Sequence, residues 1–85
     1  MTMTPVNIER GVRQVLNDVT LSPAALDTPS ESPLDAVGID SVGMIDLIYR
    51  IEEQFGIQIP DEDVTPDNFA SIASLVNLVS RKCSN

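Results

Sequence analysis

Apolar residues recur at intervals of three and four in three separate stretches of this chain, and that spacing is typical of amphipathic helices. The stretches cover residues 5–19, 41–55 and 71–82, with polar residues at most of the remaining positions. Helices of this kind bury their apolar faces against one another, so the pattern predicts an all-α fold that needs no strand. At 85 residues the chain has room for one small domain, which we expect over 1–85 with an ordered core over about 5–82.

Capping residues mark the ends of these helices. Thr4-Pro5 suits the start of the first helix, and either Asp40 or Ser41 can cap the second. Gly56 is placed to end the second helix, and Ser71 can cap the last one. The side chains expected to face the core are Ile8, Val12, Val15, Leu16, Val19, Met44, Leu47, Ile48, Ile51, Phe55, Ile72, Leu75, Val76 and Val79.

The connection over residues 20–40 contains three prolines and several Ser and Thr residues, which interrupt the helical pattern. We expect a long ordered loop, with a turn of helix possible at 24–26. Apolar residues that could anchor the loop to the core are Leu21, Leu26, Leu34, Val37 and Ile39. The acidic stretch over 61–67 is expected to form a short, irregular helix. The predicted architecture is a small four-helix bundle of three long helices and one short one, with a long loop between helices one and two.

Negative charge dominates the chain, which has thirteen acidic residues, five basic residues and a formal net charge of −8. Such a charge repels nucleic acid and anionic lipid surfaces, and it favours protein partners with basic surfaces. Neither nucleic acid nor a membrane is therefore an expected partner, and we expect a monomer. Cys83 is the only cysteine and the N-terminal residues contain no long apolar run, so a reducing, cytoplasmic location is expected.

Most catalytic machinery is missing from the sequence. Histidine is absent and cysteine occurs once, which excludes serine–histidine triads, cysteine–histidine pairs and the usual zinc sites. The four glycines stand apart from one another, so no phosphate-binding glycine loop is present. Asp61-Glu62-Asp63 lacks the spaced ligands and the glycine of a calcium loop. We predict that the chain is not an enzyme and holds no metal.

One residue whose side chain could be chemically modified remains, Ser41, at the expected start of the second helix. A hydroxyl group at a helix N-terminus is accessible, and the positive end of the helix dipole stabilises a phosphate esterified there. The alternative is that Ser41 is only an N-cap, which is the commoner role of an isolated Asp-Ser pair.

The sequence around Ser41 favours the first interpretation. Residues 34–48, Leu-Asp-Ala-Val-Gly-Ile-Asp-Ser-Val-Gly-Met-Ile-Asp-Leu-Ile, resemble the phosphopantetheine-attachment segment of the acyl carrier protein family. The Asp-Ser-Leu motif of that family is represented here by Asp40-Ser41-Val42. The resemblance continues through nearly the entire chain, by way of Gly38, Asp46, Glu52-Glu53, Ile59-Pro-Asp-Glu62, Phe69 and Ser71-Ile72.

The resemblance implies that a phosphopantetheinyl transferase moves 4′-phosphopantetheine from coenzyme A to Ser41, with Asp40 in a supporting role. Acyl or aminoacyl groups would then travel as thioesters on the thiol of that arm. The implied partners are a loading acyltransferase or adenylating ligase, and ketosynthase, condensation or tailoring enzymes of a polyketide, nonribosomal or fatty acid pathway. Two residues depart from the family pattern, because leucine often stands at the position of Val42 and an acidic residue at that of Gly43.

A second apolar row follows the serine along the same helix, formed by Val42, Ile45 and Tyr49. With Asp46, Glu52 and Glu53 at its edge, this row could be a docking face for partner enzymes. The alternative is that the row packs under the long loop or around buried cargo, and that Glu52 and Glu53 are simply solvated. Arg50 is expected to pair with Asp46 or Gln54.

Two rival functions stay open. One is a non-covalent acidic helical adaptor, in which the second apolar row binds a partner helix and Ser41 is a cap. The other is an aminoacyl or peptidyl carrier, which differs from an acyl carrier in its cargo.

Overall fold

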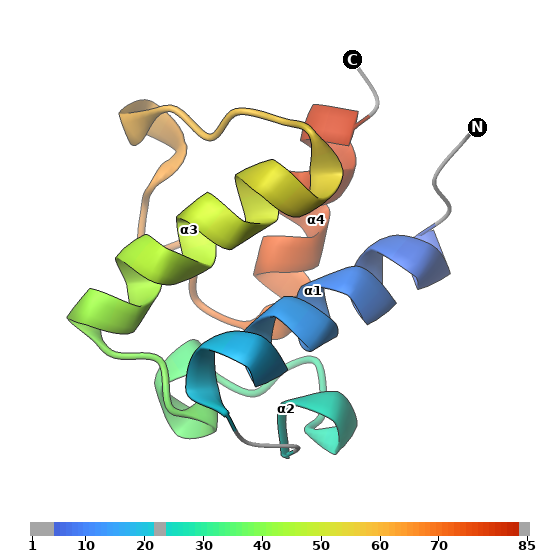
Figure 1. Ribbon diagram of the computed structural model, residues 1–85, viewed down its shortest axis with the longest axis vertical. Helices are drawn as coiled ribbons and strands as arrows, with labels where there is room; N and C mark the ends of the chain where they lie inside the picture. The colour runs from blue at the N-terminus through green and yellow to red at the C-terminus, as the bar shows by residue number, and fades with distance from the viewer. Residues whose placement is uncertain (1–4, 22–23, 84–85) are drawn as a thin grey trace.

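The computed structural model describes residues 5–21 and 24–83 and shows a helical protein without a strand in those ranges (Figure 1). The long helices are α1 (Pro5–Thr20), α3 (Ser41–Phe55) and α4 (Ile72–Cys83). Shorter elements lie between them: α2 (Ala24–Asp27), the 3-10 helix η1 (Leu34–Val37) and the 3-10 helix η2 (Asp61–Asp63). The predicted all-α fold with three long helices is therefore confirmed, and so is the helical turn near 24–26.

The helix ends agree with the capping residues in the sequence. α1 begins at Pro5, although its expected capping residue, Thr4, lies outside the described residues. Gly56 ends α3 in the left-handed conformation, with φ of 65°. Ser71 caps α4, since its Oγ accepts a hydrogen bond of 3.1 Å from the amide of Ser74.

The core is built around α1, which packs against α2, α3 and α4 (Figure 1). The predicted core faces are confirmed: the named residues of all three long helices are either fully buried or half-buried against the core. Leu78, Ile59 and Phe69 complete this core. The completely buried large side chains are Ile8, Leu16, Leu47, Ile51, Ile72, Leu75, Leu78, Val12 and Val79.

The loop between α1 and α3 is tied down along most of its length. Leu34, Val37 and Ile39 are buried as expected, whereas Leu21 and Leu26 are exposed, so the prediction that they anchor the loop is wrong. The carbonyl of Ser30 instead accepts a hydrogen bond of 2.8 Å from the amide of Ala73. The loop therefore contacts the first turn of α4 through its backbone as well as the core through its apolar side chains.

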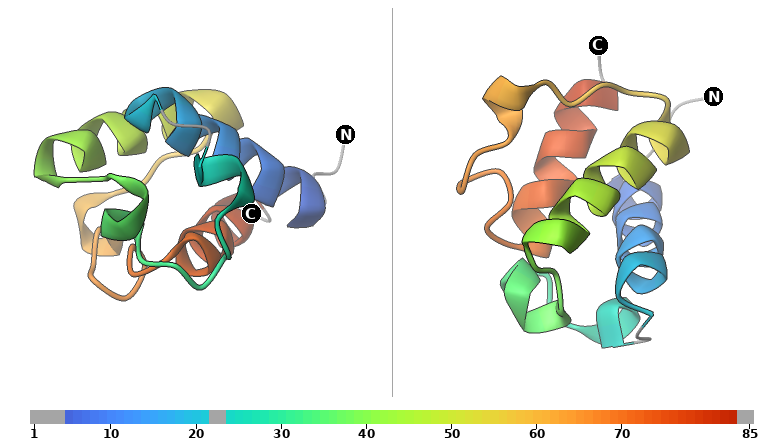
Figure 2. Two further views of the ribbon diagram at one scale, coloured as in Figure 1. Left: turned by 90° about the horizontal axis from the view of Figure 1, so that it is seen from below. Right: turned by 60° about the vertical axis from the view of Figure 1, so that its left-hand side comes forward.

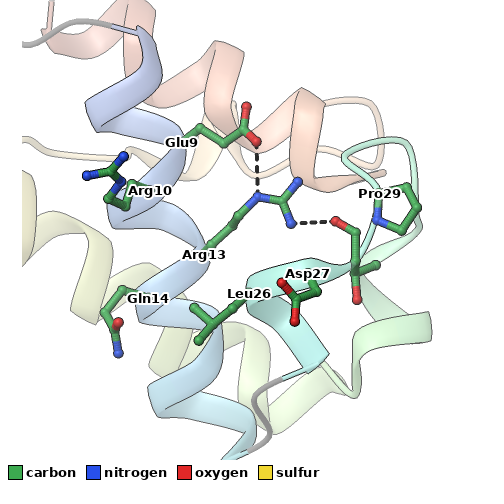
Figure 3. Close-up of a pocket in the computed structure, with 8 residues that line it drawn as sticks. Glu9, Arg10, Arg13, Gln14, Leu26, Asp27 and Pro29 are labelled. Atoms are coloured by element: carbon green, nitrogen blue, oxygen red, sulfur yellow. Dashed lines mark hydrogen bonds and ion pairs between the residues drawn. The ribbon is translucent and has the colours of Figure 1, made fainter.

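Arg13 holds the same loop against α1 from the other side. Figure 3 shows its guanidinium between the carboxylate of Glu9, at 3.0 Å, and the carbonyl oxygen of Thr28. The Arg13 side chain is largely buried while that of Glu9 is partly exposed. A groove beside this contact is lined mainly by polar side chains of α1 and by residues 26–29. Arg13 is thus part of the scaffold that holds the loop against α1.

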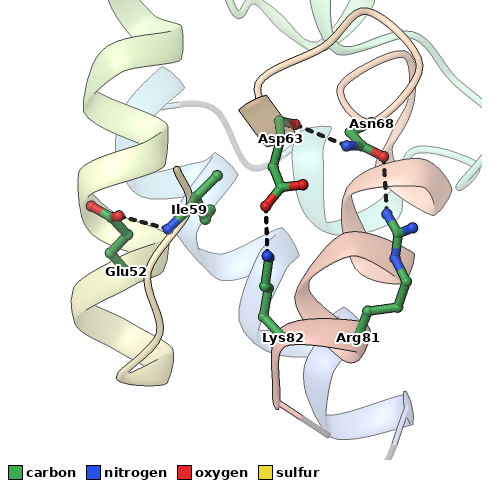
Figure 4. Close-up of polar contacts among 6 residues, drawn as sticks. All are labelled: Glu52, Ile59, Asp63, Asn68, Arg81 and Lys82. Atoms are coloured by element: carbon green, nitrogen blue, oxygen red, sulfur yellow. Dashed lines mark hydrogen bonds and ion pairs between the residues drawn. The ribbon is translucent and has the colours of Figure 1, made fainter. Parts of the chain in front are cut away.

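Helices α3 and α4 are linked by the segment 56–71 (Figure 2). Polar contacts fix this segment at both edges, as Figure 4 shows. Glu52 Oε2 accepts a hydrogen bond of 2.8 Å from the amide of Ile59, and Lys82 Nζ lies 2.5 Å from Asp63 Oδ2. Asn68 accepts a bond of 3.0 Å from Arg81. A fourth bundle helix over 61–67 is not confirmed, because only the three residues of η2 are helical there.

Candidate functional site

Asp40 is the residue that caps α3. Its backbone is extended, its Oδ1 accepts a hydrogen bond of 2.7 Å from the amide of Gly43, and its carbonyl accepts one of 2.8 Å from Met44. Ser41 is consequently the first residue inside the helix. The sequence left the cap open between these two residues, and the structure gives it to Asp40. A capping role therefore does not account for a serine at position 41.

The backbone before the serine is fixed by local structure. Gly38 ends η1 with φ of 97°, a conformation that glycine adopts without a steric penalty. The amide of Ile39 donates a hydrogen bond of 3.1 Å to the carbonyl of Leu34, and the side chain of Ile39 is buried. Residue 41 thus follows a buried anchor and a capping residue at a defined point of the fold.

The electrostatics at this helix end suit a phosphate ester. The first amide groups of an α-helix have no acceptor within the helix, and Asp40 accepts from one of them, that of Gly43. The remaining partial positive charge favours an anion at the first turn. Within the first turn of α3 itself no side chain is acidic, and the one carboxylate at this helix end is that of the capping residue Asp40.

The second apolar row of α3 faces solvent. Val42 is 78% exposed, Ile45 61% and Tyr49 69%, whereas Leu47 and Ile51 on the opposite face are completely buried. The expected alternative, in which this row packs under the long loop, is not what the structure contains. Three large apolar side chains in a row on one helix face form an exposed patch of the kind found at protein interfaces.

The acidic residues along this face differ in their contacts. Asp46 forms an exposed ion pair of 3.1 Å with Arg50, which confirms the expected pairing of Arg50. Glu52 is half-buried and its carboxylate binds the amide of Ile59, so this side chain also holds the segment 57–60 in place. Glu53 is exposed at the edge of a groove that includes Tyr49. Asp46 and Glu53 are the acidic residues that face solvent most directly.

Gly43, which departs from the family pattern, has a local structural role. A Cβ atom at this position would lie 3.2 Å from Asp40 Oδ1 and 3.7 Å from Cγ1 of Val19 in α1. An acidic side chain there would bring a second negative charge next to the capping carboxylate. The absence of a side chain at Gly43 therefore leaves room for α1 and α3 to lie close together beside the cap.

Removing the cap has a predictable cost. We expect Asp40→Ala to lower the free energy of unfolding by about 1 kcal/mol, because the amide of Gly43 loses its acceptor. Asp40→Asn keeps an oxygen at the same place and should cost less. Urea denaturation of the two variants measures both effects. An Asp40→Ala variant as stable as the parent protein would contradict the capping role.

Sequence reasoning missed two features near this helix. It did not detect that Glu52 reaches the backbone of Ile59, seven residues later, around the turn at Gly56. It also assigned Leu21 to the core, although the side chain is 88% exposed.

No group of three His, Cys, Asp or Glu side chains that could hold a metal ion occurs within 5–21 and 24–83. No helix in those ranges is long and apolar enough to cross a bilayer.

Comparison with known proteins places this geometry in context. Residues 10–79 match the family model described as phosphopantetheine attachment site. The chain is 30% identical to aminoacyl carrier protein 2 of Bradyrhizobium diazoefficiens over 93% of this chain and 90% of that protein. It is 28% identical to an acyl carrier protein of Acidothermus cellulolyticus, over 94% of this chain and 93% of that one.

A solved structure is similar as well. The match is to a chain in the crystal structure of engineered Bradyrhizobium japonicum glycine:carrier protein ligase complexed with carrier protein from Agrobacterium tumefaciens and AMP. The TM-score is 0.72 at 32% sequence identity, and the match covers 84% of this chain and 96% of that chain.

Proposed function

Because this chain belongs to the acyl carrier protein family, whose members hold a covalently attached 4′-phosphopantetheine group, we propose that Ser41 is the attachment residue. The observation that carries the proposal is the position of Ser41 immediately after the capping residue Asp40. The cap satisfies the helix without the serine, and the positive helix end favours the phosphodiester. The cap therefore does not compete with esterification at residue 41.

The test is enzymatic attachment followed by mass measurement. Coenzyme A and a promiscuous phosphopantetheinyl transferase are incubated with the protein, and the intact mass should rise by one phosphopantetheinyl group. Fragmentation should place the added mass on the peptide that contains Ser41. A protein that stays unmodified, while a known carrier is modified completely under the same conditions, would contradict the proposal.

The protein's role is to hold cargo as a thioester on the thiol of the arm and to present it to partner enzymes. Carrier proteins are not themselves catalytic, and the absence of histidine from the whole sequence agrees with that role. An ordinary thiol is only slightly ionised at neutral pH, so thioester formation depends on the active sites of partners. Without a partner, the holo protein is expected to show no turnover of its own.

Two cargo classes follow from the relatives. An acyl group, in a fatty acid or polyketide pathway, is supported by the matched acyl carrier protein. An aminoacyl group, supplied by an adenylating ligase, is supported by the aminoacyl carrier relative and by the structure that contains a glycine:carrier protein ligase and AMP. Incubation of the holo protein with such a ligase, ATP and single amino acids separates the two. A hydroxylamine-sensitive mass gain favours the aminoacyl class, and loading only by an acyltransferase favours the acyl class.

The docking face proposed for these partners consists of Val42, Ile45, Asp46, Tyr49, Glu52 and Glu53. Its exposed apolar centre and acidic edge suit a partner with an apolar surface surrounded by basic residues, as does the net charge of −8. Glu52 has the weakest case, because its carboxylate already binds the amide of Ile59. The rival adaptor function would be favoured if a folded Ser41→Ala variant kept full biological activity.

A further inference from the structure

Leu21 has an unusual conformation for a leucine. It is the residue after α1, and its amide donates a hydrogen bond of 2.7 Å to the carbonyl of Asn17. Its φ is 55°, and it is the one residue other than glycine with a positive φ in the described ranges. Glycine is the usual residue at a helix end of this kind, because a side chain in the left-handed region is disfavoured.

Burial of the side chain does not explain a leucine at this position. The side chain is 88% exposed, compared with 78% for Val42 and 69% for Tyr49. A leucine in the left-handed region stores backbone strain, and an outlier of this kind is a basis for a hypothesis of function. Glycine would relieve that strain.

The place of Leu21 connects it with the attachment site. Val19 lies beside the first turn of α3, since a Cβ at Gly43 would lie 3.7 Å from it, and Thr20 lies beside the residue that ends η1, since a Cβ at Gly38 would lie 3.6 Å from it. Figures 1 and 2 show the C-terminal end of α1 on the same side of the molecule as the N-terminal half of α3. Leu21 is therefore held at the Ser41 end of the protein.

We propose that Leu21 is a contact residue for the phosphopantetheinyl transferase, a role that rests on the proposed attachment at Ser41. An enzyme that brings coenzyme A to Ser41 has to cover the surface around the start of α3. Around the start of α3 that surface combines the exposed apolar side chains of Val42 and Ile45 with the exposed capping carboxylate of Asp40. The acidic side chains Asp46 and Glu53 come later in the helix. The fitting partner surface has an apolar depression at the serine and basic residues farther along α3.

The test uses a substitution that separates folding from recognition. Leu21→Gly places the residue that suits φ of 55° and removes the exposed side chain. We expect the melting temperature to stay unchanged or to rise. We expect the KM for the carrier in phosphopantetheinyl transfer to rise about tenfold at saturating coenzyme A, as for the loss of one good apolar interface contact, with kcat nearly unchanged.

Two further variants serve as controls. Leu21→Met keeps an apolar side chain and should keep the KM of the parent protein. Val64→Ala shortens another exposed apolar residue, 39% exposed at the end of η2, and should leave the KM unchanged. An unchanged KM for Leu21→Gly, or a lower melting temperature for that variant, would overturn the proposal. If the parent protein itself acquires no arm, the attachment at Ser41 is the proposal that fails.

Discussion

Ser41→Ala is expected to abolish the attachment of phosphopantetheine completely and to leave the helical fold intact. The hydroxyl oxygen of residue 41 forms the bond to phosphorus in the proposed reaction, and alanine offers no replacement. The folding cost is small because Asp40 provides the cap and alanine is a strong helix former, so the free energy of unfolding should change by less than about 0.5 kcal/mol. Intact mass after incubation with transferase and coenzyme A gives the first result, and urea denaturation gives the second.

Ser71→Ala is the matched control for this experiment. Ser71 also stands at a helix start, but there the side chain is the cap, with its Oγ 3.1 Å from the amide of Ser74. We expect Ser71→Ala to lose about 1 kcal/mol of stability and to acquire the arm normally. A Ser41→Ala protein that still gains the full mass would show that another residue is modified.

Leu47→Ala is expected to have the largest effect on stability of the substitutions considered. The side chain is completely buried in the core between the long helices, so its removal leaves a cavity and costs about 2–5 kcal/mol of unfolding free energy. A small domain has only about 5–15 kcal/mol in total, so the variant should be partly unfolded at elevated temperature. Thermal and urea denaturation followed by circular dichroism measure the loss.

Ile45→Ala, two residues away on the same helix, should behave in the opposite way. Ile45 is 61% exposed, so its truncation should change stability by less than about 0.5 kcal/mol. If the exposed row is the docking face, this variant should instead show weaker binding to partner enzymes. Equal losses of stability in Leu47→Ala and Ile45→Ala would contradict the assignment of the two faces.

The helices and their core faces could be predicted because they depend on local patterns. Spacing gave the buried row of Leu47 and Ile51, and capping chemistry gave Gly56 and Ser71 as helix ends. Spacing also gave the second row that begins at Val42, but it left open whether that row is exposed or packed. The choice between Asp40 and Ser41 as the cap was not decidable in this way. Both side chains can accept from the helix amides, and only the backbone path after Ile39 selects one of them.

The features that sequence did not reveal depend on contacts between distant residues or on single backbone angles. The bond from Ile59 to Glu52 and the ion pair between Asp63 and Lys82 form only after α3 and α4 are placed. The left-handed conformation of Leu21 has no sequence signal, because leucine is not a residue that marks such turns. The segment 61–67 has helix-compatible residues, but only Asp61–Asp63 are helical.

The burial of Ile39 has a consequence for the delivery of cargo. Ile39 lies in the core two residues before the proposed attachment residue, and Asp40 between them is hydrogen-bonded to the first turn of α3. A prosthetic group on residue 41 would therefore start from backbone that is connected to the core on its N-terminal side. The reach of the cargo would come from the length of the arm, and its direction from the orientation in which a partner enzyme binds the protein.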